Sequence, residues 1–245
     1  MRPAPAAALL LPLLAAAGAW ARPAGDVDFQ SAKVIETVQP EFPEPLYDLF
    51  REGGRATVEI SLDERGRLVD WLPVSYNDSR FADLAVAALK QWRYQPARWH
   101  GQPVAVTIPL TFDFELRGVV INGTRTSWAE AYFNSLFHER ISYYPHALGD
   151  LDRVPAAVHT VAPHYDQSLA DRGVSGEVTV KFFVDEEGRV RMASVVGRPD
   201  PALADLAIGA IDQWRFEPPT WHGRPVLAEL TQVFRFRPAQ AADRS

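Results

Sequence analysis

The clearest hydrophobic pattern lies between Val104 and Leu116, where large apolar residues alternate with small or polar ones. A period of two over this length predicts a strand with one buried face and one solvated face. The stretch from Val226 to Phe236 repeats the alternation, with Gln232 at one inward position. Two shorter alternating segments, joined by an Asp-Glu-Glu-Gly turn, predict a hairpin from Val178 to Val196. The chain is therefore predicted to be rich in antiparallel strands.

Helical periodicity lies between each predicted hairpin and the long strand that follows it. After Asp200 and Pro201, apolar residues recur at intervals of three and four as far as Trp214. Asp is a good N-cap and Pro suits the first turn, so a helix is predicted to begin there. The same stripe runs from Phe81 to Trp92. The candidate caps of this earlier helix are Asn77, Asp78 and Ser79.

These elements occur twice in the same order. With an offset of 122 residues, Gly54–Leu116 aligns with Gly176–Pro238 without a gap, and 25 of the 63 aligned positions are identical. Self-similarity at a fixed spacing is the mark of a repeated structural unit. The predicted fold class is α+β, with two tandem copies of one domain. Each copy is expected to be a three-stranded antiparallel sheet with helices on one face.

The repeat and the segments around it predict the domain organisation. The expected parts are a signal peptide at 1–21, a first domain at 32–118, a helical linker at 119–153, a second domain at 154–238 and a polar tail at 239–245. Within the linker, Ser127 and Glu130 have capping-box spacing and begin an amphipathic stretch that continues to Ile141. This helix either packs on an adjoining domain or binds a partner. Short helices are also expected at 45–51 and 167–171.

The first 21 residues have the layout of a secretory leader. Arg2 supplies a positive charge, an apolar run extends from Ala6 to Ala19, and Ala19-Trp20-Ala21 is a small-x-small cleavage signal. The run is short for a membrane span, which needs about 20 apolar residues. We therefore expect cleavage after Ala21 and a periplasmic protein. The alternative is an inner-membrane protein anchored through an uncleaved N-terminal segment.

Composition and motifs argue against catalysis and against charged polymers as partners. The net charge is −6 and the sequence has no basic stripe, which disfavours nucleic acid. The chain contains no Cys, so it has no disulfide or thiolate site. His100 and His222 occupy equivalent Trp-His-Gly turns, and repetition explains them without a metal, which needs three or four donors. The sequence carries no phosphate-binding loop or nucleophile elbow. We expect no enzyme activity, no metal and no cofactor.

Several short motifs follow one another in a fixed order in the second copy. They are Pro163-His164-Tyr165, Gly176-Glu177-Val178, Val184 to Val190, Trp214 to Pro218, Gly223 to Val226 and Phe234-Arg235-Phe236. This ordered set resembles the C-terminal domain of TonB-family proteins, and the first copy shows the same order from Pro40 to Phe114.

The resemblance implies a TonB-like periplasmic module that takes part in transmembrane transport. Such a module binds an extended segment of a TonB-dependent outer-membrane receptor beside its final strand, by strand augmentation. Energy transducers of the family also have a membrane helix and a Pro-rich spacer. This chain scatters its 20 prolines and its leader looks removable. The resemblance therefore supports receptor binding more than energy transduction. The alternative is a periplasmic scaffold or envelope-maintenance protein that binds another periplasmic protein without energy coupling.

The two final strands differ at one position that bears on docking. Pro109 stands in the first copy where the second has Thr231, and proline has no N–H to donate to an added strand. We therefore predict that the second copy docks the partner. The predicted docking edge consists of Glu229, Leu230, Thr231, Gln232, Val233, Phe234 and Arg235. The alternative is that sheet edges pair with each other, between copies or by self-association of chains.

Overall fold

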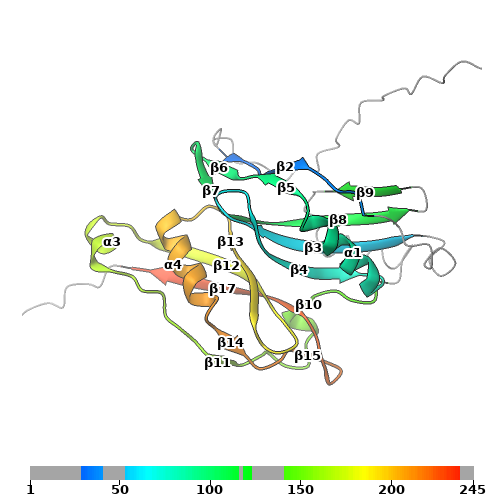
Figure 1. Ribbon diagram of the computed structural model, residues 1–245. Coiled ribbons are helices and arrows are strands. Elements are labelled where there is room, and N and C mark those ends of the chain that lie inside the picture. Colours follow the sequence, from blue (N-terminus) through cyan, green and yellow to red (C-terminus); the bar gives the residue numbers. More distant parts are fainter. Residues whose placement is uncertain (1–28, 41–52, 116–117, 123–140, 238–245) are drawn as a thin grey trace, which may run out of the picture.

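The structure is a computed structural model that describes residues 29–40, 53–115, 118–122 and 141–237 (Figure 1). Four sequence predictions fall outside these residues. They are the signal peptide at 1–21, the short helix at 45–51, the linker helix that begins at Ser127, and the polar tail at 239–245.

The first copy forms a four-stranded antiparallel sheet in the order β4-β3-β8-β9. Its strands are β3 (Gly54–Leu62), β4 (Leu68–Tyr76), β8 (Val106–Glu115) and β9 (Gly118–Asn122). Helix α1 (Ser79–Leu89) packs on one face of the sheet. Its buried side chains join those of β3 and β8 in a core that includes Phe81, Leu89, Phe112 and Phe114.

The second copy forms a four-stranded mixed sheet in the order β10-β17-β12-β13. Its strands are β10 (His146–Ala147), β12 (Gly176–Val184), β13 (Val190–Val196) and β17 (Ala228–Phe236). Strand β10 runs parallel to β17, and the other pairs are antiparallel. Helix α4 (Pro201–Ile211) covers one face, and the short helix α3 (Gln167–Asp171) precedes β12.

The α+β class is therefore correct, but the prediction of three-stranded sheets is wrong. The three predicted strands form in both copies, and each final strand gains a neighbour on its outer side. In the first copy the chain turns back after β8 and adds β9. In the second copy β10, from the segment between the copies, lies beside the beginning of β17. An edge strand offers unpaired backbone groups, and nearby chain satisfies part of them in both cases.

Among the described residues, one small three-stranded sheet and three strand pairs border the two large sheets. They are β1 (Phe29–Gln30), β6 (Ala97–Trp99) and β7 (Gln102–Val104); β2 (Lys33–Glu36) and β5 (Arg93–Gln95); β11 (Ala157–His159) and β14 (Arg215–Phe216); and β15 (Thr220–Trp221) and β16 (Arg224–Pro225). A 3-10 turn, η2 (Leu148–Asp150), follows β10.

The helix starts follow the capping rules read from the sequence. The Asp78 side chain accepts a hydrogen bond from the Arg80 N–H, and the Asp200 side chain accepts one from the Ala202 N–H. Beyond the helices, the indole Nε1 of Trp92 donates to the Val38 carbonyl, and that of Trp214 donates to the Val161 carbonyl, both at 2.8 Å. The two tryptophans therefore tie the same preceding loop to the same core in both copies.

The two sheets pack against each other through the faces that the helices leave uncovered. Leu72 and Val74 of β4 form one apolar cluster with Phe183 of β12, Met192 of β13 and Leu227. We call this contact the seam. Figure 1 shows the first sheet in the upper part of the molecule and the second below it, with β4 and β13 at the junction. Aligned packing of two sheets buries the inner face of each.

Charged side chains accompany the apolar cluster at the seam. The Lys181 ammonium lies 4.0 Å from the carboxylate of the buried Glu59 and 3.5 Å from that of Glu229. A guanidinium N–H of Arg191 donates to the Asp70 carboxylate at 3.1 Å and to the Trp71 carbonyl at 3.2 Å. Breaking up the seam would therefore uncover both apolar and charged groups.

Candidate functional site

The candidate site is the outer side of β17. On its inner side β17 pairs with β12 along its whole length, from Ala228 opposite Val184 to Phe236 opposite Gly176. On its outer side, the only pairing among the described residues is with β10, at Ala228 and Glu229. The outer side from Leu230 to Phe236 has no strand beside it in the described part of the chain. We call this stretch the open edge.

The backbone direction shows which residues offer hydrogen bonds at the open edge. The carbonyl of Leu227 points outward, because it accepts a hydrogen bond of 2.8 Å from the His146 N–H of β10. Backbone groups of successive residues alternate between the two sides of a strand. The N–H and C=O groups of Thr231, Val233 and Arg235 therefore point outward, and those of the residues between them point to β12.

The side chains of the predicted edge divide into two sets. Those of Leu230 and Phe234 are buried in the helix-covered core, as part of the second hydrophobic cluster. Those of Thr231, Val233 and Arg235 are exposed on the opposite face. Gln232 is half-buried on the core side, between Leu230 and Phe234. The predicted docking residues thus form one strand with a fixed inner face. Three of them, Thr231, Val233 and Arg235, direct both backbone and side chain away from β12 and the core, and the Val233 carbonyl accepts a hydrogen bond of 3.0 Å from the Gln232 amide.

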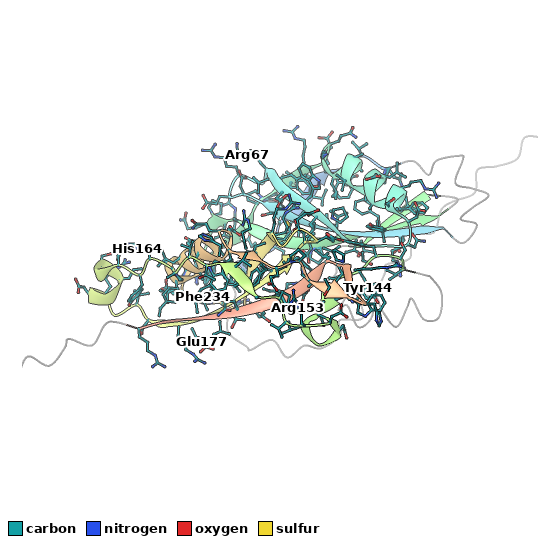
Figure 2. The ribbon with its side chains drawn as sticks, turned by 90° about the horizontal axis from the view of Figure 1, so that it is seen from below. Arg67, Tyr144, Arg153, His164, Glu177 and Phe234 are labelled. Carbon is teal, nitrogen blue, oxygen red and sulfur yellow. The ribbon has the colours of Figure 1, made fainter. Side chains whose placement is uncertain are left out.

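Ion pairs with β12 hold both ends of this strand. Arg235 donates to the Glu177 carboxylate at 2.9 Å, and Glu229 lies beside Lys181. Figure 2 labels Glu177 and Phe234 toward one end of β17 and Tyr144 toward the other. The Arg235–Glu177 pair is exposed and an exposed pair is worth little, so the paired ladder with β12 supplies most of the strand's rigidity.

The equivalent strand of the first copy has a different environment. Strand β9 pairs with β8 from Thr111 to Glu115, positions that the 122-residue offset places at Val233 to Arg237. In the first copy, β9 thus pairs with the part of the final strand whose equivalent in the second copy belongs to the open edge. Pro109 lies opposite Glu59 of β3 and occupies the position of Thr231, so its missing N–H is an outward one.

Strand β10 is fixed by an aromatic and polar cluster. The ring of His146 lies 4.7 Å from that of Tyr144 and 4.9 Å from that of Trp221, between ring centres. Burial lowers the pKa of His146 below its ordinary value, against an opposing effect of Asp150, so the ring is neutral at pH 7. Sequence reasoning missed β10, because two residues carry no periodic signal.

The segment after β10 clamps the hairpin of β15 and β16. Both carboxylate oxygens of Asp152 accept hydrogen bonds of 2.8 Å, from the backbone N–H groups of His222 and Gly223. These bonds lower the pKa of Asp152, chiefly through Gly223. His222 has a φ of 50°, and His100 a φ of 48° in the equivalent turn. The two histidines therefore shape turns, as repetition suggested.

No group of three or more His, Asp or Glu side chains in the described residues is placed to hold a metal ion. Within the same residues, no helix is long and apolar enough to cross a membrane.

Comparison with known proteins identifies the repeated unit. The family described as "Gram-negative bacterial TonB protein C-terminal" matches residues 38–116 and again 161–238. The chain belongs to this TonB C-terminal family. Both matches contain the final strand and the helix of their copy, so the duplication is a duplication of the family's domain.

Individual relatives cover less of the chain. Over 85 residues it is 31% identical to "Protein TonB" of Vibrio cholerae serotype O1, which is 34% of this chain and 35% of that protein. The chain thus spans about a third of the length of this relative. The solution NMR structure of the Pseudomonas aeruginosa TonB CTD is 26% identical, with a TM-score of 0.33, over 40% of this chain and 97% of that one.

Proposed function

We propose that this chain is a TonB-type periplasmic binding protein that works in transport across the outer membrane. In this proposal the open edge of β17 recruits an extended segment of an outer-membrane receptor as an added strand. The observation that carries the proposal is the run of outward backbone groups at Thr231, Val233 and Arg235, with no neighbouring strand in the described residues. Of these groups, the Val233 carbonyl accepts a hydrogen bond of 3.0 Å from the Gln232 side chain, which a docked strand would replace.

The energetics of strand addition suit this edge. A net gain of about 0.5–1.5 kcal/mol for each main-chain hydrogen bond makes a few such bonds enough for a specific but reversible contact. β17 is already held along β12, so the protein loses little conformational freedom when a partner strand adds. Side chains of the added strand would lie beside the exposed Thr231, Val233 and Arg235 on one face, which gives selectivity.

The test uses the full-length chain and synthetic peptides that cover the periplasm-facing segments of the outer-membrane receptors encoded in the same genome. Titration calorimetry compares the wild-type protein with Thr231→Pro and Thr231→Ala. The proline removes one outward N–H and leaves the β12 ladder intact, as Pro109 does in the first copy. Loss of one such bond should weaken binding roughly 2- to 13-fold in Thr231→Pro. Thr231→Ala keeps the N–H and should bind within about twofold of wild type.

Two results would contradict this proposal. One is that no receptor peptide binds the wild-type chain. The other is that Thr231→Pro, folded by circular dichroism, binds as tightly as wild type and Thr231→Ala. Capture of cell-wall factors alone from the periplasm would instead support the scaffold alternative.

Export is part of the same proposal and has its own measurement. N-terminal sequencing of the protein from a periplasmic fraction should give a chain that begins near Arg22. Recovery of a chain that retains residues 1–21, in the inner-membrane fraction, would replace the cleaved protein by an anchored one.

A further inference from the structure

We propose that β10 is a built-in stop that fixes how far a docked strand extends along β17. The docked segment then occupies the stretch from Thr231 to the end of the strand and does not continue beside Glu229. This inference rests on the proposed docking function, because it defines the length and register of the segment that docks.

The first argument is that β10 already uses the backbone groups on the outer side of β17 before Thr231. His146 pairs with Ala228 and Ala147 pairs with Glu229, in parallel orientation. The His146 N–H donates to the Leu227 carbonyl at 2.8 Å. A docked strand that continued toward Ala228 would have to displace β10, because one outward N–H or C=O cannot serve two strands at once.

The second argument is that β10 is anchored well beyond its two paired residues. The His146 ring is buried between Tyr144 and Trp221. On the C-terminal side, the Ala147 N–H donates to Asp150 at 3.2 Å and the Asp152 carboxylate holds the β15–β16 hairpin. Displacing β10 therefore disrupts buried ring contacts as well as backbone hydrogen bonds.

The residues on the N-terminal side of β10 also anchor it. Tyr143 stacks on Tyr76 of β4, with ring centres 4.7 Å apart, and its hydroxyl donates to Glu186 at 2.8 Å. The backbone N–H and C=O of Tyr143 also pair with Tyr76. The stop is thus attached to both copies, which makes it a fixed part of the docking edge.

Strand β9 of the first copy serves as a measure for the space that is left. It has five residues, and its register places Asn122 opposite Thr111. On β17 the same register would place Asn122 opposite Val233. Two further residues would reach Thr231, the last outward position before the stop. The docked segment should therefore span about seven residues, opposite Thr231 to Arg237 and so one residue past the end of β17, since strands pair residue by residue.

The experiment uses a peptide series built on β9. Its shortest member has the sequence Gly118–Asn122, and longer members add one, two or three Thr-Val pairs at the C-terminal end, which this register directs toward Thr231. Affinity for the wild-type chain should rise severalfold from five to seven residues and then stay within about twofold at nine and eleven, because no outward group remains to be paired.

Variants at the stop make the plateau testable. His146→Pro removes the N–H that binds Leu227, and His146→Gly keeps this N–H but removes the buried ring. Affinity should continue to rise at nine and eleven residues in His146→Pro, and less steeply in His146→Gly. The control is His222→Gly, which removes the ring that lies against Trp221 and leaves the residues of β10 unchanged. Glycine also tolerates the positive φ of this position. This variant should keep the plateau at seven residues.

Amide exchange in the uncomplexed protein separates failure of the stop from failure of docking. The Glu229 amide should exchange severalfold more slowly than those of Thr231, Val233 and Arg235, because only Glu229 faces β10. Equal exchange at these four amides, or affinity that keeps rising to eleven residues in wild type, would overturn the stop. Protection of Glu229 together with failure of every peptide to bind would overturn the docking function instead.

Discussion

Strands β8 and β17 occupy equivalent places in two copies of one domain, yet their outer sides have different neighbours. The chain folds back on β8 and supplies β9, whereas the stretch of β17 beyond Glu229 has no outer neighbour in the described residues. The inner ladders have the same register in both copies. Gly54 lies opposite Phe114 in the first, and the equivalent Gly176 lies opposite Phe236 in the second. Duplication thus preserved the sheet and its core while the outer edges diverged, one closed and one available.

The most severe test of this difference is to close the second edge with the strand that closes the first. Replacing residues 238–244 by the sequence of residues 116–122 gives β17 a following segment in the same register as β9. Receptor-peptide binding should fall by tenfold or more, because an intramolecular strand competes at high effective concentration. Calorimetry measures the loss. A graft with Pro at the positions of Val120 and Asn122, which lie opposite outward-facing residues in this register, lacks two of the N–H groups that would pair with β17 and should restore binding.

If peptides still bound the grafted chain while amide exchange showed the new strand paired to β17, the open edge would not be the docking surface. The difference between the closed edge of β8 and the open edge of β17 would then have no role in binding.

A smaller but well-defined difference separates the first strands of the two sheets. A Cβ added at Gly54 would lie 2.3 Å from the Phe81 ring, whereas one added at Gly176 would lie 3.7 Å from Leu203 Cδ1. Overpacking in a rigid core costs about 1–3 kcal/mol, so Gly54→Ala should lower the free energy of unfolding by that amount. Gly176→Ala should change it by less than about 0.5 kcal/mol.

Urea denaturation of the two full-length variants measures these changes. Equal destabilisation by both substitutions would show that the two cores tolerate volume alike, which would contradict the difference described for these strands.

The smallest expected effect concerns the pH dependence of β10, which has no counterpart among the described residues of the first copy. Burial lowers the pKa of His146 from 6.5, so the released segment takes up a proton more readily than the folded one. The stability of the β10 contact should therefore fall as pH drops through about 6.5, and be constant above it. Exchange of the Glu229 amide, corrected for its intrinsic pH dependence, should accelerate roughly two- to fivefold between pH 7.5 and 5.5.

His146→Gln removes the titrating ring, so its Glu229 amide should lose this additional acceleration. An acceleration that persists in His146→Gln would assign the effect to a group other than His146.

Much of the fold was predictable because local signals agree with it. The strand alternation, the Asp-capped helices and the helix at Gln167–Asp171 all appear where the sequence indicates. The turn glycines also have a physical reason. Gly188 has a φ of 79°, and a Cβ there would lie 2.0 Å from the Phe216 carbonyl oxygen. Such signals depend only on neighbours in the sequence.

The rest depended on contacts between distant segments. Leu72 and Val74 appear in the sequence as ordinary residues of a strand, and nothing local says that their face meets Phe183. The register shift between Thr57 and Val58 helps to set which side of β4 they occupy. Likewise β10 is defined by its partner and not by its own two residues. The choice of β17 as the docking edge stays a prediction that rests on Thr231 and its outward N–H.

The seam has a practical consequence for any attempt to study one copy alone. Cutting the chain between the copies would expose Leu72, Val74, Phe183 and Met192 to water and leave Glu59 without Lys181. A contiguous exposed apolar surface of this kind promotes aggregation. A binding assay on one copy alone would then measure non-specific association in place of specific docking. Binding should therefore be measured on the chain that contains both copies.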